Sequence, residues 1–333
     1  MKAKSELHCL VSNLKELLPI ANSHLVHFIT RNSFERMIPK YLQDEIMSLD
    51  MNEMNQLVLS RFSNDGTIPR PTNSTTPHLI SFLNDTQKLS LKHNSSCLSF
   101  EDLLKCIESK VDSGSSFHIS KHLMSMKKSH EVEIMSAIVA AIAKGEKCTH
   151  IIDVGGGKGY LSSVLALKHE LKVLSVDSSL VTSKGAERQM PKIEVETDVL
   201  FYRALLELYL EKKLGSANGT SQFKVGKLKR KCSSFNEYVH KSIERLGIHI
   251  QVDNDELQQL YDYHAEVSRK QLHAFFLLKL TIAPAIEAVI MLDRLLYLQE
   301  QGIQDAHLVQ LFDPVVSPRC FSIVAFNRPK TNL

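Results

Sequence analysis

Residues 149–160 combine an apolar run with an acid and closely spaced glycines. The apolar run ends at Asp153, and Gly155, Gly157 and Gly159 follow. Glycine adopts positive φ without a steric penalty, which a sharp turn from strand to helix often requires. Glycines also leave bare backbone at the start of the next helix, where amide groups can bind a ligand. This pattern predicts a loop that binds a nucleotide-type cofactor.

A second acid stands where such a cofactor would present its sugar. The apolar run at residues 171–176 ends in Asp177, 22 residues beyond Gly155. In nucleotide-binding α/β folds, an acid at the end of the second strand accepts hydrogen bonds from ribose hydroxyls. We therefore expect Asp177 to hold a ribose.

The glycine spacing separates the candidate cofactors. A dinucleotide fingerprint, G-x-G-x-x-G, would need glycine at Tyr160. A phosphate-binding loop, G-x-x-x-x-G-K-[ST], would need glycine at Ile152 and a hydroxyl residue at Gly159. The pattern present, D-x-G-x-G-x-G, resembles the first motif of class I S-adenosylmethionine-dependent methyltransferases. A nicotinamide-dependent oxidoreductase is the weaker alternative that this spacing opposes.

The apolar periodicity predicts the elements around this loop. Helical spacing covers residues 5–62, and a Ser-, Thr- and Pro-rich stretch at 63–99 predicts a surface loop. A short helix is expected at 100–110, and a longer one capped by Ser129 and ending at Lys144–Gly145. The first strand, the glycine loop, a helix through His169 and the second strand follow.

The second half of the chain is predicted to be mostly helical. Helices are expected at 199–214, near Phe235 and from 257 to 298, where Pro284 should break or kink the helix because it lacks an N–H. Two strands joined by a turn are expected at 308–314 and 319–326.

Several segments together resemble a narrower family, the methyltransferase-like protein 25 family. They occur in the family's order, at Met124–Val132, Asp153–Ser162, Gly185–Arg188, Leu292–Glu300 and Phe312–Arg319. The resemblance implies an α/β fold, a Rossmann-like class I methyltransferase sheet with a helical N-terminal extension. It implies S-adenosylmethionine as the cofactor, bound at Asp153, Gly155, Gly157, Gly159, Tyr160 and Asp177. It also places Lys127, Lys128 and His130 at the entrance for cofactor or substrate.

The resemblance suggests three regions. Residues 1–112 would form the helical N-terminal region with its loop at 63–99, and residues 113–198 the cofactor-binding half of the methyltransferase domain. Residues 199–333 would supply a helical insert plus a C-terminal helix and strand pair that completes the domain.

The chain differs from the family in one respect that bears on its catalytic activity. About twenty residues separate the second strand from the helix at 199, whereas one βαβ unit takes about 30 or more. We therefore expect a shortened form with an incomplete sheet, in which residues 247–252 are a weak substitute strand. The sequence leaves two functions open. The first is an S-adenosylmethionine-dependent methyltransferase, whose activity this shortened form could have lost. The second is a non-catalytic protein that binds the cofactor or has a regulatory role.

Three other segments carry residues that could do chemistry of their own. His118 and His122 lack a third ligand, so no metal site is expected. Asp313-Pro314-Val315 differs from the [DN]-P-P-[FYW] motif of adenine methyltransferases and predicts a turn. The basic run at 224–231 could contact RNA phosphates or act as a nuclear address, and is more often an exposed loop.

Composition sets the broad class. A net charge of +3 demands no polyanionic partner, and charges interrupt the most apolar stretch, so no membrane partner is expected. The six cysteines are scattered, without a C-x-x-C pair, which suits a cytoplasmic or nuclear location. The methyl acceptor stays open, with RNA, protein or a small molecule as candidates.

Overall fold

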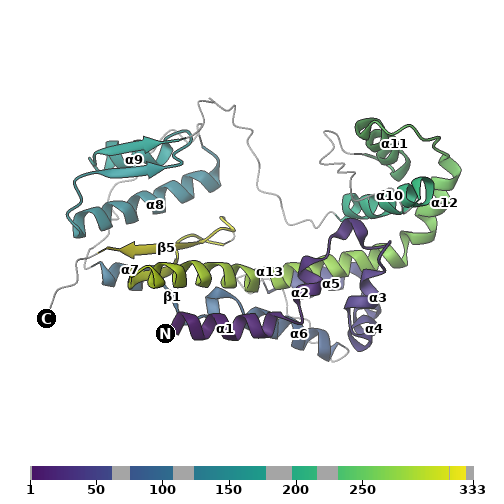
Figure 1. The fold of residues 1–333 in the computed structure, drawn as a ribbon, viewed down its shortest axis with the longest axis horizontal. Helices are drawn as coiled ribbons and strands as arrows, with labels where there is room; N and C mark the ends of the chain where they lie inside the picture. Colours follow the sequence, from purple (N-terminus) through teal and green to yellow (C-terminus); the bar gives the residue numbers. More distant parts are fainter. Residues whose placement is uncertain are drawn as a thin grey trace. The chain divides into compact units, whose positions relative to one another are not determined.

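The chain folds into two compact units in the computed structural model, which describes residues 2–61, 76–107, 124–177, 197–215, 232–314 and 316–327 (Figure 1). The first unit holds Met1–Cys9, Leu91–Glu194 and Val289–Leu333, and the second holds Leu10–Ser90 and Val195–Ala288. The division falls within helices α1 (Lys2–Leu14) and α13 (Val267–Glu300). Each unit draws on more than one of the three regions expected from the sequence.

The second unit is helical throughout its described residues. The helices expected over 5–62, at 199–214 and near Phe235 are confirmed. The unit contains α2 (Leu18–Asn22), η1 (Leu25–His27), α3 (Ser33–Met37), α4 (Lys40–Ser48), α5 (Met51–Leu59), α6 (Pro77–Lys88), α10 (Asp198–Leu214), α11 (Phe235–Leu246) and α12 (Asn254–Ala265).

The first part of α13 is the core helix of this unit. Leu272, Phe275 and Ile282 are fully buried, and the Phe275 ring meets Phe28 edge-on at 5.3 Å between centroids. His273 is hydrogen-bonded to Asn55 of α5 and to Thr197, each at 3.0 Å. By length and composition α13 could also cross a membrane, a test that buried core helices pass as well. The packing accounts for its apolar character here.

The helix expected from 257 to 298 is interrupted at a different place from the one predicted. It does not break at Pro284, which lies inside α13, and the break falls at Glu266, between α12 and α13. Burial on both sides of Pro284, at Ile282 and Ala285, holds the helix together despite the missing N–H.

The surface loop predicted at 63–99 is wrong from residue 77 onward. Residues 77–88 form α6, with Pro77 in its first turn, a position where the missing N–H costs nothing. Leu79 and Leu83 are buried, so a tertiary contact overrides the polar composition. Farther along lie η2 (Leu91–His93) and strand β1 (Cys97–Leu98). Residues 63–75 of the predicted loop lie outside the described residues.

The core of the first unit is a three-stranded sheet covered by helices. β1 pairs in parallel with β4 (Asp305–Gln310), which pairs antiparallel with β5 (Phe321–Phe326). The two strands expected near the C-terminus are thus confirmed. Helices α7 (Phe100–Cys106) and α8 (Met126–Gly145) supply buried apolar residues to this core, with Leu103, Ile107, Ile138, Val309, Leu311, Phe312, Cys320 and Phe326 at its centre.

Helix α8 begins earlier than the sequence suggested. Ser125, not Ser129, is its N-cap, and the Ser125 hydroxyl accepts a hydrogen bond from the Lys128 amide at 3.3 Å. Ser129 lies inside the first turn, so Lys127 and Lys128 are helical residues.

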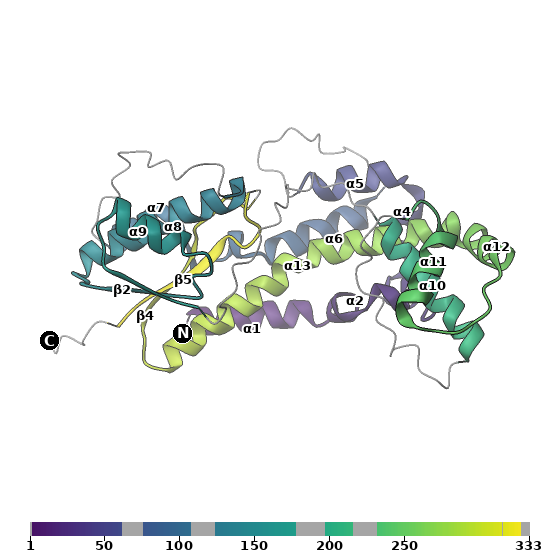
Figure 2. The ribbon, with the colours of Figure 1, turned by 90° about the horizontal axis from the view of Figure 1, so that it is seen from above.

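A second sheet of two parallel strands lies in the same unit. β2 (Ile151–Val154) pairs in register with β3 (Val173–Val176), and α9 (Tyr160–Lys168) connects them. α8 ends and β2 begins at the same end of this unit in both ribbon views (Figures 1 and 2). The pair β4–β5 belongs to the three-stranded sheet of the same unit rather than to the β2–β3 sheet. Residues 247–252 are not a strand.

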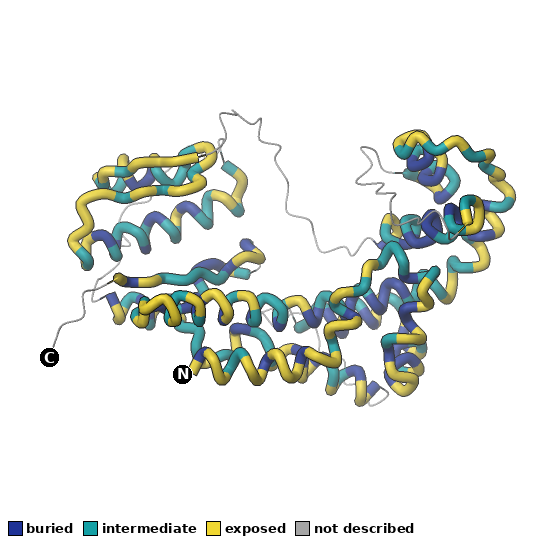
Figure 3. The backbone as a smooth tube through the Cα atoms, viewed as in Figure 1, coloured by how far each residue is buried: buried dark blue, intermediate teal, exposed yellow. Residues whose placement is uncertain are grey.

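One face of the β2–β3 sheet is uncovered within the described part of the chain. Ile152, Val154, Leu174 and Val176 share this face, because side chains two residues apart point the same way. Their exposed fractions are 64%, 80%, 61% and 47%, and both strands stand out as exposed in Figure 3. Parallel sheets are normally covered on both faces. The β2–β3 sheet therefore has the exposed apolar surface expected of an incomplete sheet.

A matched pair of leucine substitutions tests whether the β2–β3 sheet is uncovered while the three-stranded sheet is packed. Leu308 of β4 is fully buried and Leu174 of β3 is 61% exposed. Leu308→Ala should lower the free energy of unfolding by about 2–5 kcal/mol, because it leaves a cavity. Leu174→Ala should change it by less than about 0.5 kcal/mol. Urea denaturation followed by circular dichroism measures both, and equal losses would contradict the uncovered face.

Candidate cofactor-binding site

The parallel pairing of β2 and β3 sets the geometry of the site. Ile151 pairs with Val173 and Val154 with Val176, so both strands end at the same level. The Gly155 amide donates to the Val176 carbonyl at 2.7 Å, which extends the pairing by one step into the loop. The glycine loop after β2 and the acid after β3 are therefore neighbours, as the sequence predicted.

The glycine loop adopts the backbone conformation for which glycine is suited. Gly155, Gly157 and Gly159 have φ values of 80°, 56° and 69°. A Cβ built at any of the three would have no described atom within 4 Å. Glycine is therefore required here by φ rather than by crowding, and the open space beside the backbone can receive a ligand.

Gly156 is not one of the three glycines of the motif, and it is required because a side chain would not fit. A Cβ at this position would lie 2.2 Å from Ser175 Oγ and 3.0 Å from Asp153 Oδ2. The loop therefore passes directly over the side chains of β2 and β3. The sequence contains three consecutive glycines here, but their spacing does not indicate that Gly156 is the one packed against other side chains.

The two acids hold the loop through hydrogen bonds. Asp177 Oδ2 accepts from the Gly157 amide at 2.7 Å, and Asp153 Oδ2 accepts from Ser162 Oγ of α9 at 2.5 Å. Asp153 thus connects the end of β2 to the first turn of α9. A carboxylate has about four acceptor positions, so Asp153 retains capacity for a ligand. Ser162 was not singled out in the sequence as a partner of Asp153.

The first turn of α9 adds backbone donors to the site. Gly159, in the left-handed region, is the N-cap, and Tyr160 is the first helical residue. The Gly159 amide donates to Gly156 and the Ser163 amide to Gly159, at 2.9 and 2.8 Å. The amides of residues 160–162 precede the first intrahelical donor, and the helix dipole makes this end favourable for negative charge.

Lys127, Lys128 and His130 contact a different part of the unit. Both lysines lie near the Glu131 carboxylate, at 3.7 and 3.8 Å. His130 Nε2 accepts from the Asp313 amide at 3.2 Å, and the ring meets Phe312 edge-on. Among the described residues, no hydrogen bond or ion pair links these three side chains to the glycine loop.

The same contacts bring together two segments that the family resemblance had singled out. Glu131 Oε1 accepts from Ser317 Oγ at 2.8 Å, and Ser317 is fully buried. The start of α8 is thereby attached to the connection between β4 and β5. Neither Glu131 nor Ser317 was proposed as a partner from the sequence.

Several predicted features fall outside the described residues. They are His118, His122, the segment 185–188 and the basic run at 224–231. In the described part of the chain, no group of three or more His, Cys, Asp or Glu side chains could hold a metal ion.

Comparisons with known proteins indicate the class of protein that this chain resembles. Residues 127–259 match the family model of a methyltransferase domain. The chain is also similar to "Probable methyltransferase-like protein 25" of Mus musculus, 41% identical over 133 residues, which are 40% of this chain and 22% of that protein. The Homo sapiens protein of the same name is 40% identical over 167 residues, 49% of this chain and 27% of that protein. No solved structure matches.

The strand, the glycine loop and the second acid all lie within residues 127–259, the part of the chain that resembles a methyltransferase domain. The resemblance to the methyltransferase-like protein 25 family is confirmed by the two relatives. The matches span about a quarter of the length of these relatives.

Gly156→Ala tests whether the loop lies directly on the strands. The new methyl group would clash with Ser175 Oγ and crowd Asp153 Oδ2. We expect the free energy of unfolding to fall by about 1–3 kcal/mol, as overpacking does. Ser175→Ala in the same chain should recover part of the loss, which a double-mutant cycle measures. A Gly156→Ala chain as stable as the parent would contradict this loop geometry.

Proposed function

We propose that the chain binds S-adenosylmethionine at the ends of β2 and β3 and acts as a methyltransferase. The observation that carries the proposal is the hydrogen bond from the Gly157 amide to Asp177, which places the bare loop against the acid that would hold the ribose. The family match supports the same class of reaction.

Each group at the site has a defined part in binding. Asp177 would accept hydrogen bonds from the ribose hydroxyls, and the amides at the start of α9 would face the carboxylate of the methionine part. Gly155, Gly157 and Gly159 would let the cofactor lie against the main chain. Asp153 would hold the loop through Ser162 and accept from the methionine ammonium. Tyr160 would line the cofactor beside the first turn of α9.

The open space beside the glycines fits such a ligand, since no described atom lies within 4 Å of the three Cβ positions. S-adenosylmethionine would supply a methyl group already activated by its sulfonium. The protein then has to align the acceptor and exclude water, which needs no dedicated nucleophile on the chain. Lys127, Lys128 and His130 are proposed as part of the entrance, on the basis of the family resemblance.

Asp177→Ala tests the cofactor site. It removes the acceptor for the ribose and the partner of the Gly157 amide, so S-adenosylmethionine affinity should fall at least about tenfold. Isothermal titration calorimetry measures the dissociation constant. Glu133→Ala, which removes an exposed acid of α8, is the control and should bind like the parent. Equal affinity for Asp177→Ala and the parent would refute the placement of the ribose.

A second assay separates an enzyme from a protein that only binds the cofactor. Methyl-labelled S-adenosylmethionine is incubated with cell extract and the chain, and incorporation into RNA, protein and small molecules is measured separately. Transfer that the parent chain catalyses and Asp177→Ala does not would reject the binding-only alternative. Cofactor binding without transfer would reject catalysis by this form.

A further inference from the structure

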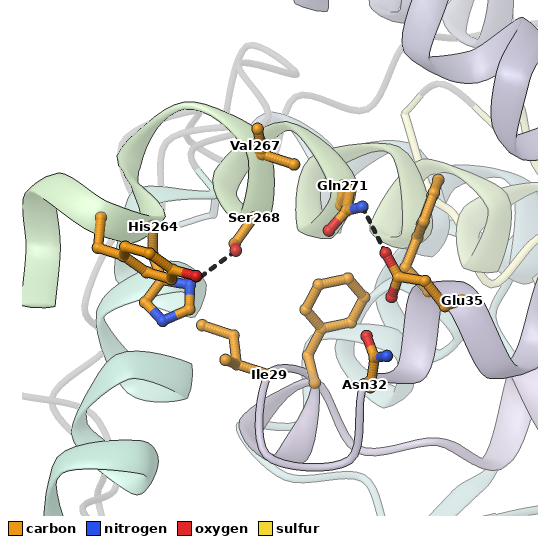
Figure 4. A pocket seen from close by; sticks show the side chains of 10 residues that line it. Ile29, Asn32, Glu35, His264, Val267, Ser268 and Gln271 are labelled. Atoms are coloured by element: carbon orange, nitrogen blue, oxygen red, sulfur yellow. Dashed lines mark hydrogen bonds between the residues drawn. The ribbon is translucent and has the colours of Figure 1, made fainter.

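The second unit contains a hollow of about 500 Å³ between residues 28–35 and residues 263–271 (Figure 4). Hollows of 300–1,000 Å³ are the usual size for small-ligand sites. One side comes from the end of η1 and the start of α3, and the other from the junction of α12 and α13. The hollow is separate from the glycine loop, which lies in the other unit.

Hydrogen-bond acceptors gather at one end of this hollow. Gln271 Nε2 donates to Glu35 Oε1 at 2.7 Å, which leaves Gln271 Oε1 and Glu35 Oε2 as acceptors. Figure 4 shows the Asn32 side chain beside them, at the same end. The Asn32 side chain makes no capping hydrogen bond to α3, whereas its backbone amide donates to the Ile29 carbonyl at 3.0 Å. Three side chains from two elements thus offer oxygen atoms to one region.

The electrostatic balance of the hollow is negative. Of the described residues that line it, Glu35 carries a formal charge, and none is lysine or arginine. His264 lies at the other end, where its Nδ1 and Ser268 Oγ are 2.7 Å apart. Burial, and then the nearby Lys212, lower the pKa of His264, so its ring is neutral at pH 7. A phosphate or carboxylate ligand would therefore meet repulsion here.

Apolar side chains form the rest of the lining. Phe28 and Phe34 are almost fully buried, and Ile29 and Val267 complete the walls. Asn32, which also lines the hollow, has a left-handed backbone conformation, with φ of 48°. Asparagine adopts this region more readily than most residues.

We propose that this hollow binds a guanidinium group, with Glu35, Asn32 and Gln271 accepting its N–H donors and the apolar walls holding its alkyl stem. A guanidinium has five donors in one plane and no acceptor, which matches a cluster of oxygen acceptors with one negative charge. Its planar face also packs well on aromatic rings. An arginine side chain in a peptide and a free guanidino compound share this chemistry.

The test is titration of the full chain with three probes, N-acetyl-L-arginine amide, agmatine and N-acetyl-L-citrulline amide. Citrulline has nearly the shape of arginine without its charge. We expect the arginine probe to bind at least about tenfold more tightly than the citrulline probe. Tighter binding of agmatine than of the arginine amide would indicate a free guanidino ligand, and the reverse would indicate a peptide.

Glu35→Gln isolates the charge, because it keeps the shape and a hydrogen-bonding partner for Gln271. It should weaken binding of the arginine probe about tenfold. Asp44→Asn removes an exposed acid from the same unit and is the matched control, with no expected change. Circular dichroism verifies that both variants are folded. Equal binding of the arginine and citrulline probes, unchanged affinity in Glu35→Gln, or no binding at millimolar probe would overturn the proposal.

Discussion

The parallel pairing of β2 with β3 is the interaction on which the account depends. Four residue pairs in register bring both strands to an end at the same level, and the Gly155 amide continues the pairing into the loop. A shift of the register by one residue would move Asp177 away from the Gly157 amide and turn the apolar face around. The position of the acid relative to the glycines is therefore a consequence of strand register.

That same sheet is also the incomplete part of the structure. It contains two strands in the described chain, and its apolar face is uncovered at Ile152, Val154, Leu174 and Val176. Neighbouring elements normally cover both faces of a parallel sheet, so an uncovered apolar face lowers the solubility and the rigidity of the protein. The sequence predicts that central strands of this sheet are missing, because about twenty residues separate β3 from α10, and their absence would account for this exposure.

The site was predictable where local backbone chemistry decides the structure. Glycine spacing indicated the positive φ values of Gly155, Gly157 and Gly159, and the acid after the second apolar run placed Asp177. The predictions from the sequence were wrong where contacts between distant residues determine the structure. Burial of Leu79 and Leu83 turns a polar stretch into α6. The contact of His130 with Asp313 joins positions 183 residues apart, which no periodicity reports.

The most direct measurement is the backbone amide NMR spectrum of the chain titrated with S-adenosylmethionine. The account predicts saturable shifts at the amides of Gly155, Gly157 and Tyr160. It predicts no shifts at Gly247 and Gly302, which also have positive φ but lie in other turns. Unchanged loop amides at millimolar cofactor, or equal shifts at all five residues, would contradict a cofactor site at the ends of β2 and β3.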